Sequence, residues 1–445
     1  MVTQDPTGQG SDPQSIEASA RINGVLTRHM PQIAALTVRG GGVISSFAVT
    51  YLLGRYFGAA ATGQFGLMMQ TAMFLAVLGL MGLDVSVVRH FAKTIPQKQT
   101  IALGAFGKVL GISALLLCSI VALIAVGGEW IWRLLFSDVV AIALLPLLCV
   151  LVLLRGAVQL LGGLLRSQHR FVLGMAVPSL FIPVAAAFAL FSGYAASVEG
   201  ALWGASFGGV VAIILALLFL TSHIGRGPDS VAIPMRSVMA SSLPLWGSVL
   251  TLVIGEWYGL AVAAQILGAD ASGLFRVSFQ IAASVQIISS ALAAVYSAQI
   301  STAFHSGDRL QVAQLARSAV LLSLGFAVPL AALILLSGSF LLGQIGEEFL
   351  AASPLLYVLV IGQVLIAFTG PSGLVLAMSG NERINLVISL IGITVLLALA
   401  PFAAHNLGLI GIGLSLSGVL VARNLAALII VRRKLRINIW TGTAR

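Results

Sequence analysis

The sequence predicts an all-α membrane protein with twelve transmembrane helices, arranged in two six-helix lobes around a central cavity. Three observations lead to this fold class. Only 9% of the 445 residues are charged, while 59% are hydrophobic. Long apolar stretches follow one another along almost the whole chain. A turn sequence from the first half returns in the second half, as expected for two related lobes.

The composition excludes two broad classes of protein. Soluble globular proteins are about one quarter charged, so an ordinary water-soluble enzyme is excluded. A disordered chain combines high charge with low hydrophobicity, which is the reverse of this composition. The 48 glycines and the mean hydropathy of +1.05 fit membrane helices, because glycine lets such helices pack closely.

Twelve stretches are apolar enough to span a bilayer, which takes about 20 residues. They cover approximately residues 33–57, 63–89, 101–127, 138–162, 171–195, 198–222, 238–264, 273–300, 312–338, 350–378, 384–403 and 406–431. The predicted organisation is a polar N-terminal tail (1–32), an N-lobe (33–222), a linker (223–237), a C-lobe (238–431) and a basic tail (432–445). The tail 1–32 has no apolar core of a signal peptide.

The basic residues predict the orientation of these helices. If the N-terminus is cytoplasmic, 21 of the 24 Lys and Arg residues fall on the cytoplasmic side. The remaining three are Arg55, Arg133 and Arg276. This asymmetry is the positive-inside signal, and it places both termini in the cytoplasm. It also explains the net charge of +10 without a nucleic-acid partner.

An internal repeat relates the two halves. The sequence GAAATGQF at residues 58–65 returns as GADASGLF at residues 268–275, a separation of 210 residues (58 to 268). Gln70 and Gln280 match at the same separation. Six helices lie between the copies, so both have the same orientation. This predicts a parallel repeat whose axis runs along the membrane normal.

Ionisable residues inside membrane helices are costly, and they usually face a cavity or a partner. Arg39 precedes three glycines in the first span and either binds an anion in the cavity or extends to the cytoplasmic headgroups. Glu256 in the seventh span either couples transport to a cation or lies at the interface, where Trp257 and Tyr258 are typical. Asp84 either takes part in coupling or pairs with a basic residue of another helix.

Further candidates lie near the ends of the spans. Arg55 and Arg276 break the positive-inside asymmetry, which suggests contact with an anionic headgroup, of substrate or of lipid. Arg89 belongs to a basic loop that contacts anionic lipid or substrate. Lys108, Arg155 and Arg317 are expected to extend to the cytoplasmic headgroups. Gln70 and Gln280 either line the cavity or hold helices together.

No constellation of residues predicts catalysis. The sequence has neither a P-loop, nor an HExxH motif, nor a cluster of Cys and His at metal-ligand spacing. We therefore expect a protein that is not an enzyme and that holds no metal and no cofactor.

Four segments resemble one known family. They are Tyr56–Gly66 (YFGAAATGQFG), Gly82–Ala92 (GLDVSVVRHFA), Ala271–Gln280 (ASGLFRVSFQ) and Leu376–Arg383 (LAMSGNER). In this order they resemble the bacterial polysaccharide (O-antigen and capsule repeat-unit) flippases of the multidrug/oligosaccharidyl-lipid/polysaccharide exporter superfamily. The resemblance extends from about residue 30 to 435.

The resemblance implies a function. Such flippases move a polyprenyl-diphosphate-linked oligosaccharide across the bacterial inner membrane by alternating access, and polysaccharide polymerases and glycosyltransferases act in the same process. Their helices one, two, seven and eight line the cavity, where arginines meet the diphosphate or acidic sugars. By helix position this role falls to Arg39, Arg55, Arg89 and Arg276. The alternative is a cation-coupled multidrug antiporter of the same superfamily, which would favour intramembrane carboxylates instead.

Overall fold

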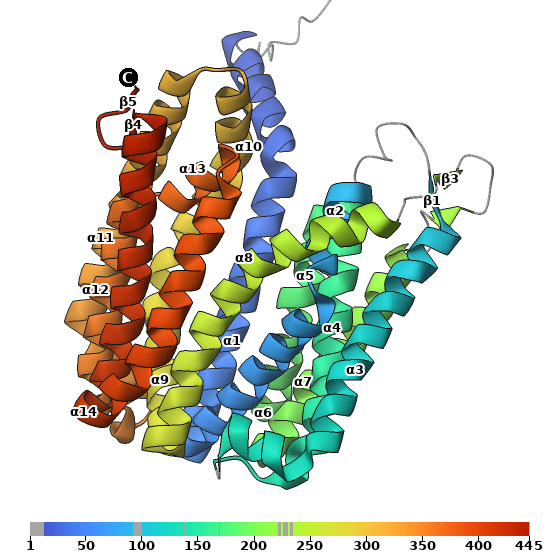
Figure 1. Cartoon of the computed structure of the whole chain (residues 1–445), viewed down its shortest axis with the longest axis vertical. Coiled ribbons are helices and arrows are strands. Elements are labelled where there is room, and N and C mark those ends of the chain that lie inside the picture. The colour runs from blue at the N-terminus through green and yellow to red at the C-terminus, as the bar shows by residue number, and fades with distance from the viewer. Residues whose placement is uncertain are drawn as a thin grey trace, which may run out of the picture.

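The computed structural model is a bundle of long helices (Figure 1). It describes residues 13–91, 100–137, 139–168, 170–220, 224–225, 230–231 and 235–444. The side chains of residues before Thr37, and those of Arg39 and Arg89, are outside the described set. The two halves of the chain, α1 to α7 and α8 to α14, pack against each other mainly through α1, α8 and α9.

The first half contains seven helices. They are α1 (Pro13–Leu80), α2 (Leu83–Phe91), α3 (Leu103–Phe136), α4 (Leu145–Ser167), α5 (Phe171–Ser179), α6 (Phe181–Phe191) and α7 (Val198–Leu220), with a 3₁₀ turn η2 (Ile142–Leu144) before α4. In α1 the backbone of Gly58 is non-helical (φ 82°), which divides the helix into a first and a second arm. Helix α1 begins at Pro13, inside the segment that was expected to be the polar N-terminal tail (1–32).

The second half repeats this succession of long and broken helices. Its helices are α8 (Met235–Val262), α9 (Ala269–Ala283), α10 (Ile287–His305), α11 (Arg309–Ile345), α12 (Ser353–Thr369), α13 (Ser372–Met378) and α14 (Glu382–Ile430). Short π or 3₁₀ turns join or extend several of them: η4 (Ala263–Leu267), η5 (Ser284–Gln286), η6 (Glu347–Ala352) and η7 (Val431–Leu435). Gly268 (φ 95°) directly precedes α9, just as Gly58 directly precedes the second arm of α1.

Short strands depart from the predicted all-α class. β1 (Thr100–Ala102) pairs in parallel with β2 (Ile224–Gly225) and β3 (Ser230–Val231), so the expected linker pairs with the segment that leads into α3. β4 (Ile437–Asn438) and β5 (Thr443–Ala444) form an antiparallel hairpin at the C-terminus. In that hairpin Ile437 and Ile439 are buried against the second half, which gives the expected basic tail an ordered, apolar anchor.

Eight described helices are long and apolar enough to cross a membrane, and the bent pair α5–α6 makes a ninth. The protein is therefore a multi-pass membrane protein. The two longest stretches are Gly40–Leu80, with 41 residues, and Arg383–Leu435, with 53 residues. Each contains a non-helical glycine, Gly58 or Gly408. A single crossing needs about 20 residues, so each stretch is long enough for two.

Candidate functional site

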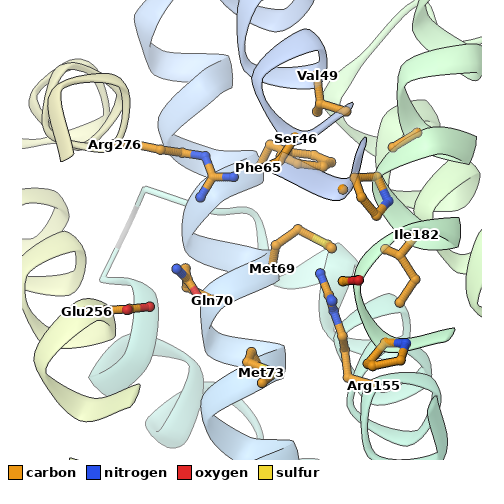
Figure 2. A pocket seen from close by; sticks show the side chains of 15 residues that line it. Ser46, Val49, Phe65, Met69, Gln70, Met73, Arg155, Ile182, Glu256 and Arg276 are labelled. Atoms are coloured by element: carbon orange, nitrogen blue, oxygen red, sulfur yellow. The ribbon is translucent and has the colours of Figure 1, made fainter. Parts of the chain in front are cut away.

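A cavity lies where the two halves of the chain meet (Figure 2). It has a volume of about 300 Å³. Its walls come from both arms of α1 and from α4, α5, α6, α8 and α9. Four polar side chains point into it in Figure 2: Gln70, Arg155, Glu256 and Arg276. The other labelled residues are apolar or small, so the site combines a few polar groups with a hydrophobic surface.

A break between α5 and α6 shapes one wall of the cavity. The axes of the two helices differ by 45°, and Pro183 lies in the first turn of α6. Proline has no N–H, so the carbonyl of Ser179 four residues earlier loses its helical donor. Gly42 of α1 packs directly on that carbonyl, where a Cβ atom would lie 2.6 Å from the oxygen. The glycine is thus required for close contact between the first arm of α1 and the break.

Arg276, which the sequence predicted as a site residue, lies in the cavity on α9. Its guanidinium carbon is 6.0 Å from the centre of the Phe65 ring, and its aliphatic stem lies against Gly66. Its Nε atom is buried and has no hydrogen-bond partner among the described residues. A buried donor that lacks a partner is costly, so the Nε atom of Arg276 is a candidate contact for a ligand.

Arg155 on α4 is a second such group, and the prediction that it extends to the headgroups is wrong. It lines the same cavity, and its Nε atom is also buried without a described partner. The two guanidinium groups are near enough to repel each other. The sequence contained a signal for this: Arg155 lies twelve residues before Ser167, about 18 Å along a helix, beyond the reach of an arginine side chain.

Glu256 on α8 is the carboxylate of the cavity. No ion pair joins it to Arg155 or Arg276 in the part of the chain that the structure describes. The neighbouring Trp257 is fixed by a hydrogen bond from its Nε1 to Thr71 Oγ1 (2.9 Å) and by stacking on Phe74. These contacts hold α8 against the second arm of α1 and so position Glu256 towards the cavity. Trp257 therefore serves as a contact between the two helices.

A second chamber of about 340 Å³ adjoins the first and shares four lining residues with it. The shared residues are Ser46, Gln70, Glu256 and Arg276. The rest of its lining is mostly apolar: Val43, Phe47, Leu260, Phe275, Phe279, Ala283 and Ile287, with Gln280 and Ser284. The combined space therefore has a polar centre and an apolar side.

Gln70 and Gln280 differ despite their matching positions in the repeat. Gln280 accepts a hydrogen bond from Thr50 Oγ1 (2.7 Å) and donates one to Ser46 Oγ (3.3 Å), so it joins α9 to the first arm of α1 while lining the second chamber. Gln70 lines both chambers. The structure thus combines the two roles that the sequence left open for this pair.

The remaining predicted residues lie elsewhere. The Arg55 side chain is exposed near the end of the first arm of α1. Asp84 is buried on α2, where Gly163 of α4 packs on its backbone and Arg166 of α4 supplies a nearby positive charge. Arg166 lies on another helix, as the sequence left open for Asp84, but no ion pair joins the two among the described residues, and Asp84 does not line the cavity. The side chains of Arg39 and Arg89 are outside the described residues.

A family comparison supplies the context for this cavity. Residues 33–298 match the family model described as "Polysaccharide biosynthesis protein". This match covers more than half of the chain. The chain belongs to the polysaccharide biosynthesis protein family. No curated protein sequence matches it significantly.

Solved structures show the fold of this family member. An inward-facing MATE-family multidrug resistance transporter of the MOP superfamily has a TM-score of 0.72 at 15% identity, over 94% of this chain and 99% of that chain. An outward-facing MATE-family transporter scores 0.61 at 16% identity, over 93% and 95%. The lipid II flippase MurJ, in an inward closed conformation, scores 0.67 at 15% identity, over 91% and 87%. The family member therefore has the MOP fold, as the sequence resemblance implied.

Proposed function

We propose that the protein moves a polyprenyl-diphosphate-linked oligosaccharide from the cytoplasmic to the outer leaflet of a bacterial inner membrane, by alternating access, for surface polysaccharide biosynthesis. The observation that carries this proposal is a pair of arginines, Arg155 and Arg276, that line one cavity and whose buried Nε atoms have no hydrogen-bond partner among the described residues. The family supports the link to polysaccharide biosynthesis.

A diphosphate matches the chemistry of the two arginines. The planar guanidinium forms two parallel hydrogen bonds to phosphate oxygens, and it stays charged when it is buried. Two such groups on opposite halves of the chain, on α4 and α9, could each bind one phosphate. A bound anion would also relieve the repulsion between them. The apolar second chamber offers a surface for the start of a polyprenyl chain.

The topology belongs to the proposal. Division of the two longest stretches at Gly58 and Gly408 gives ten spans, α5–α6 gives another, and α9–α10 gives a twelfth. Helices α1 to α7 then form the N-lobe (33–222), and α8 to α14 form the C-lobe (238–431). The basic residues orient both termini to the cytoplasm. Glycosyltransferases would supply the substrate and a polymerase would consume it.

Glu256 is the proposed coupling residue. It faces the same cavity as the two arginines, so a proton or cation bound there would change the charge that the substrate meets. Asp84 fits a different role, because it does not line the cavity and its backbone packs on Gly163 of α4, near the charge of Arg166. Arg55, Arg39 and Arg89 remain candidates for contacts with a diphosphate as it enters or leaves.

The alternative is a cation-coupled multidrug antiporter of the same fold. A cavity for cationic drugs favours carboxylates, whereas the described cavity holds two arginines and one glutamate. The charge of the site therefore favours an anionic substrate.

Purified protein in vesicles tests the proposal. A polyprenyl-diphosphate-linked oligosaccharide is placed in one leaflet, and its appearance in the other leaflet is followed with a reagent that labels only exposed sugar. We expect protein-dependent movement that Arg155→Ala and Arg276→Ala each reduce about tenfold or more, the cost of losing a charged hydrogen bond. Movement of cationic drugs, with no movement of the lipid-linked sugar, would favour the antiporter instead.

A further inference from the structure

The two copies of the repeated turn meet at one end of the cavity. Gly63 of the second arm of α1 lies against Ser272 and Ala269 of α9, and a Cβ atom at Gly63 would be 2.5 Å from the Ala269 carbonyl oxygen. Gly273, which matches Gly63 in the repeat, lies on the Ala59 carbonyl in the same way. The two helices thus touch through their backbones, which only glycine permits at these positions.

A carboxylate joins the halves beside this contact. Glu348 of η6 accepts a hydrogen bond from the backbone N–H of Ala59 (2.6 Å). Ala59 is the first residue after the non-helical Gly58, so its N–H is one of the free donors at the start of the second arm of α1. A negative charge at this position is favourable because a helix N-terminus is electropositive.

Two further contacts join the halves near the same turns. Gly54 of α1 packs on the side chains of Ile345 and Phe349, which flank Glu348. Gln265 of η4, shortly before Gly268, donates a hydrogen bond from Nε2 to the Leu134 carbonyl of α3 (2.7 Å). Each half therefore contacts the other through the chain that leads into its repeated turn.

These contacts border the cavity directly. Arg276 follows Gly273 by three residues, which is less than one helical turn. Its side chain lies on Gly66, which in turn follows Gly63 by three residues. The glycine contact therefore lies immediately beyond the guanidinium that the proposed function assigns to the diphosphate.

We infer that the Gly63–Gly273 contact, with Glu348 bound to Ala59, is the outer gate of the transporter in its closed position. This inference rests on the proposed function for its orientation and for alternating access. The gate must separate to release the substrate outwards. A side chain at either glycine prevents full closure, and removal of the Glu348 carboxylate weakens it, so both changes shift the protein towards the outward-open state.

Cysteine accessibility measures the gate directly. Met73→Cys places a thiol in the cavity, in a background in which Cys118 and Cys149, both free, are replaced by Ala. A membrane-impermeant maleimide is added to the outside of intact cells. We expect Gly63→Ala and Gly273→Ala to raise the labelling rate about tenfold or more, as overpacking predicts. We expect Glu348→Ala to raise it about threefold, the effect of losing a charge at a helix N-terminus.

Matched controls accompany each change. Gly255→Ala adds a methyl group to a helix that has open space there, and Glu347→Ala removes the neighbouring exposed carboxylate. We expect the thiol of Met73→Cys to be labelled at the same rate in both control variants as in the protein without them. Unchanged labelling in Glu348→Ala and in the glycine variants that reach the membrane overturns the gate. If neither glycine variant reaches the membrane, the exposed Glu348 decides the outcome alone.

The labelling needs no substrate, so the two proposals can fail separately. A protein that transports lipid-linked sugar while its gate variants label normally contradicts only the gate. A protein whose gate variants label rapidly, but which moves no lipid-linked sugar, contradicts only the proposed function.

Discussion

Arginine and lysine are not equivalent in a membrane cavity. Both carry a positive charge, but only the guanidinium offers two parallel donors to phosphate oxygens and stays protonated when desolvated. Arg155 and Arg276 have buried Nε atoms without partners among the described residues, so each guanidinium has at least one donor that no described protein group satisfies. We therefore expect the forked shape of the guanidinium, as well as its charge, to select the substrate.

Lysine substitution separates the two contributions. Arg276→Lys keeps the charge and loses the fork, so we expect transport of the diphosphate-linked substrate to lie between that of the native protein and that of Arg276→Ala. Initial rates in the vesicle assay provide the measurement. Native rates in Arg276→Lys would show that charge alone is sufficient.

Glu256 provides a prediction about coupling. Glu256→Gln keeps the size and polarity of the side chain but cannot lose a proton, so any dependence of transport on a pH or cation gradient should disappear. Rates with and without the gradient, in native and variant protein, make the comparison. A gradient effect that persists in Glu256→Gln assigns coupling to another group. Gln70→Glu is a useful counterpart, because it adds a second carboxylate to the same cavity.

Sequence reasoning found part of the candidate site. Glu256, Gln70 and Gln280 were predicted as polar residues inside apolar spans, and Arg276 as a basic residue near the outer end of its span. The structure places all four along the cavity. Arg155 was not predicted to line the cavity, although its distance from the end of α4 is too large for its side chain to reach the headgroups. Cavity lining depends on which face of a helix turns inwards, and apolar helices with lipid on one side and protein on the other carry a weak pattern of faces.

At the level of elements, small residues set the distances between helices. Gly208 of α7 is an example, because a Cβ atom there would lie 2.7 Å from Ala185 Cβ of α6. Gly163 of α4 is similarly close to the backbone of Asp84. With lipid tails as apolar as the side chains, such close contacts supply much of the helix association. The abundance of glycine in the sequence predicted this mode of packing, but not which helices it joins.

The α6–α7 contact gives a stability prediction. Gly208→Ala should reduce the free energy of unfolding by about 1–3 kcal/mol, the usual cost of overpacking. Gly325→Ala, on an exposed face of α11 with open space, should leave it unchanged or raise it by about 0.5 kcal/mol. The midpoint of thermal unfolding in one detergent measures both. Equal unfolding midpoints for Gly208→Ala and Gly325→Ala would show that the close α6–α7 contact at Gly208 does not contribute to stability.

Two features of the fold could not be predicted from the sequence: three short strands and the turn inside α1. The strands β1, β2 and β3 are two or three residues long and pair between distant loops, so no periodic pattern marks them. The turn between the arms of α1 depends on the positive φ of Gly58, which a glycine permits but does not require. The repeated turn itself was recognised, because turns differ more from one another than apolar helices do.

At the scale of the whole molecule, charge is scarce and its placement is informative. Most basic residues serve orientation under the proposed topology. The charged residues of the described cavity between the halves are two arginines and one glutamate. The family and the MOP fold provide the scaffold. The polar centre and the adjoining apolar chamber support the proposal that the substrate is a lipid diphosphate.

The most direct test of the central claim is binding of a short polyprenyl diphosphate, measured by the thermal stabilisation of purified protein. The account predicts that this ligand raises the unfolding midpoint of the native protein, and that a monophosphate of equal chain length raises it less. It also predicts that Arg155→Ala/Arg276→Ala abolishes the stabilisation, while Arg133→Ala, which removes an exposed arginine paired with Glu129, preserves it. Equal stabilisation of the native protein and the double variant would contradict the account.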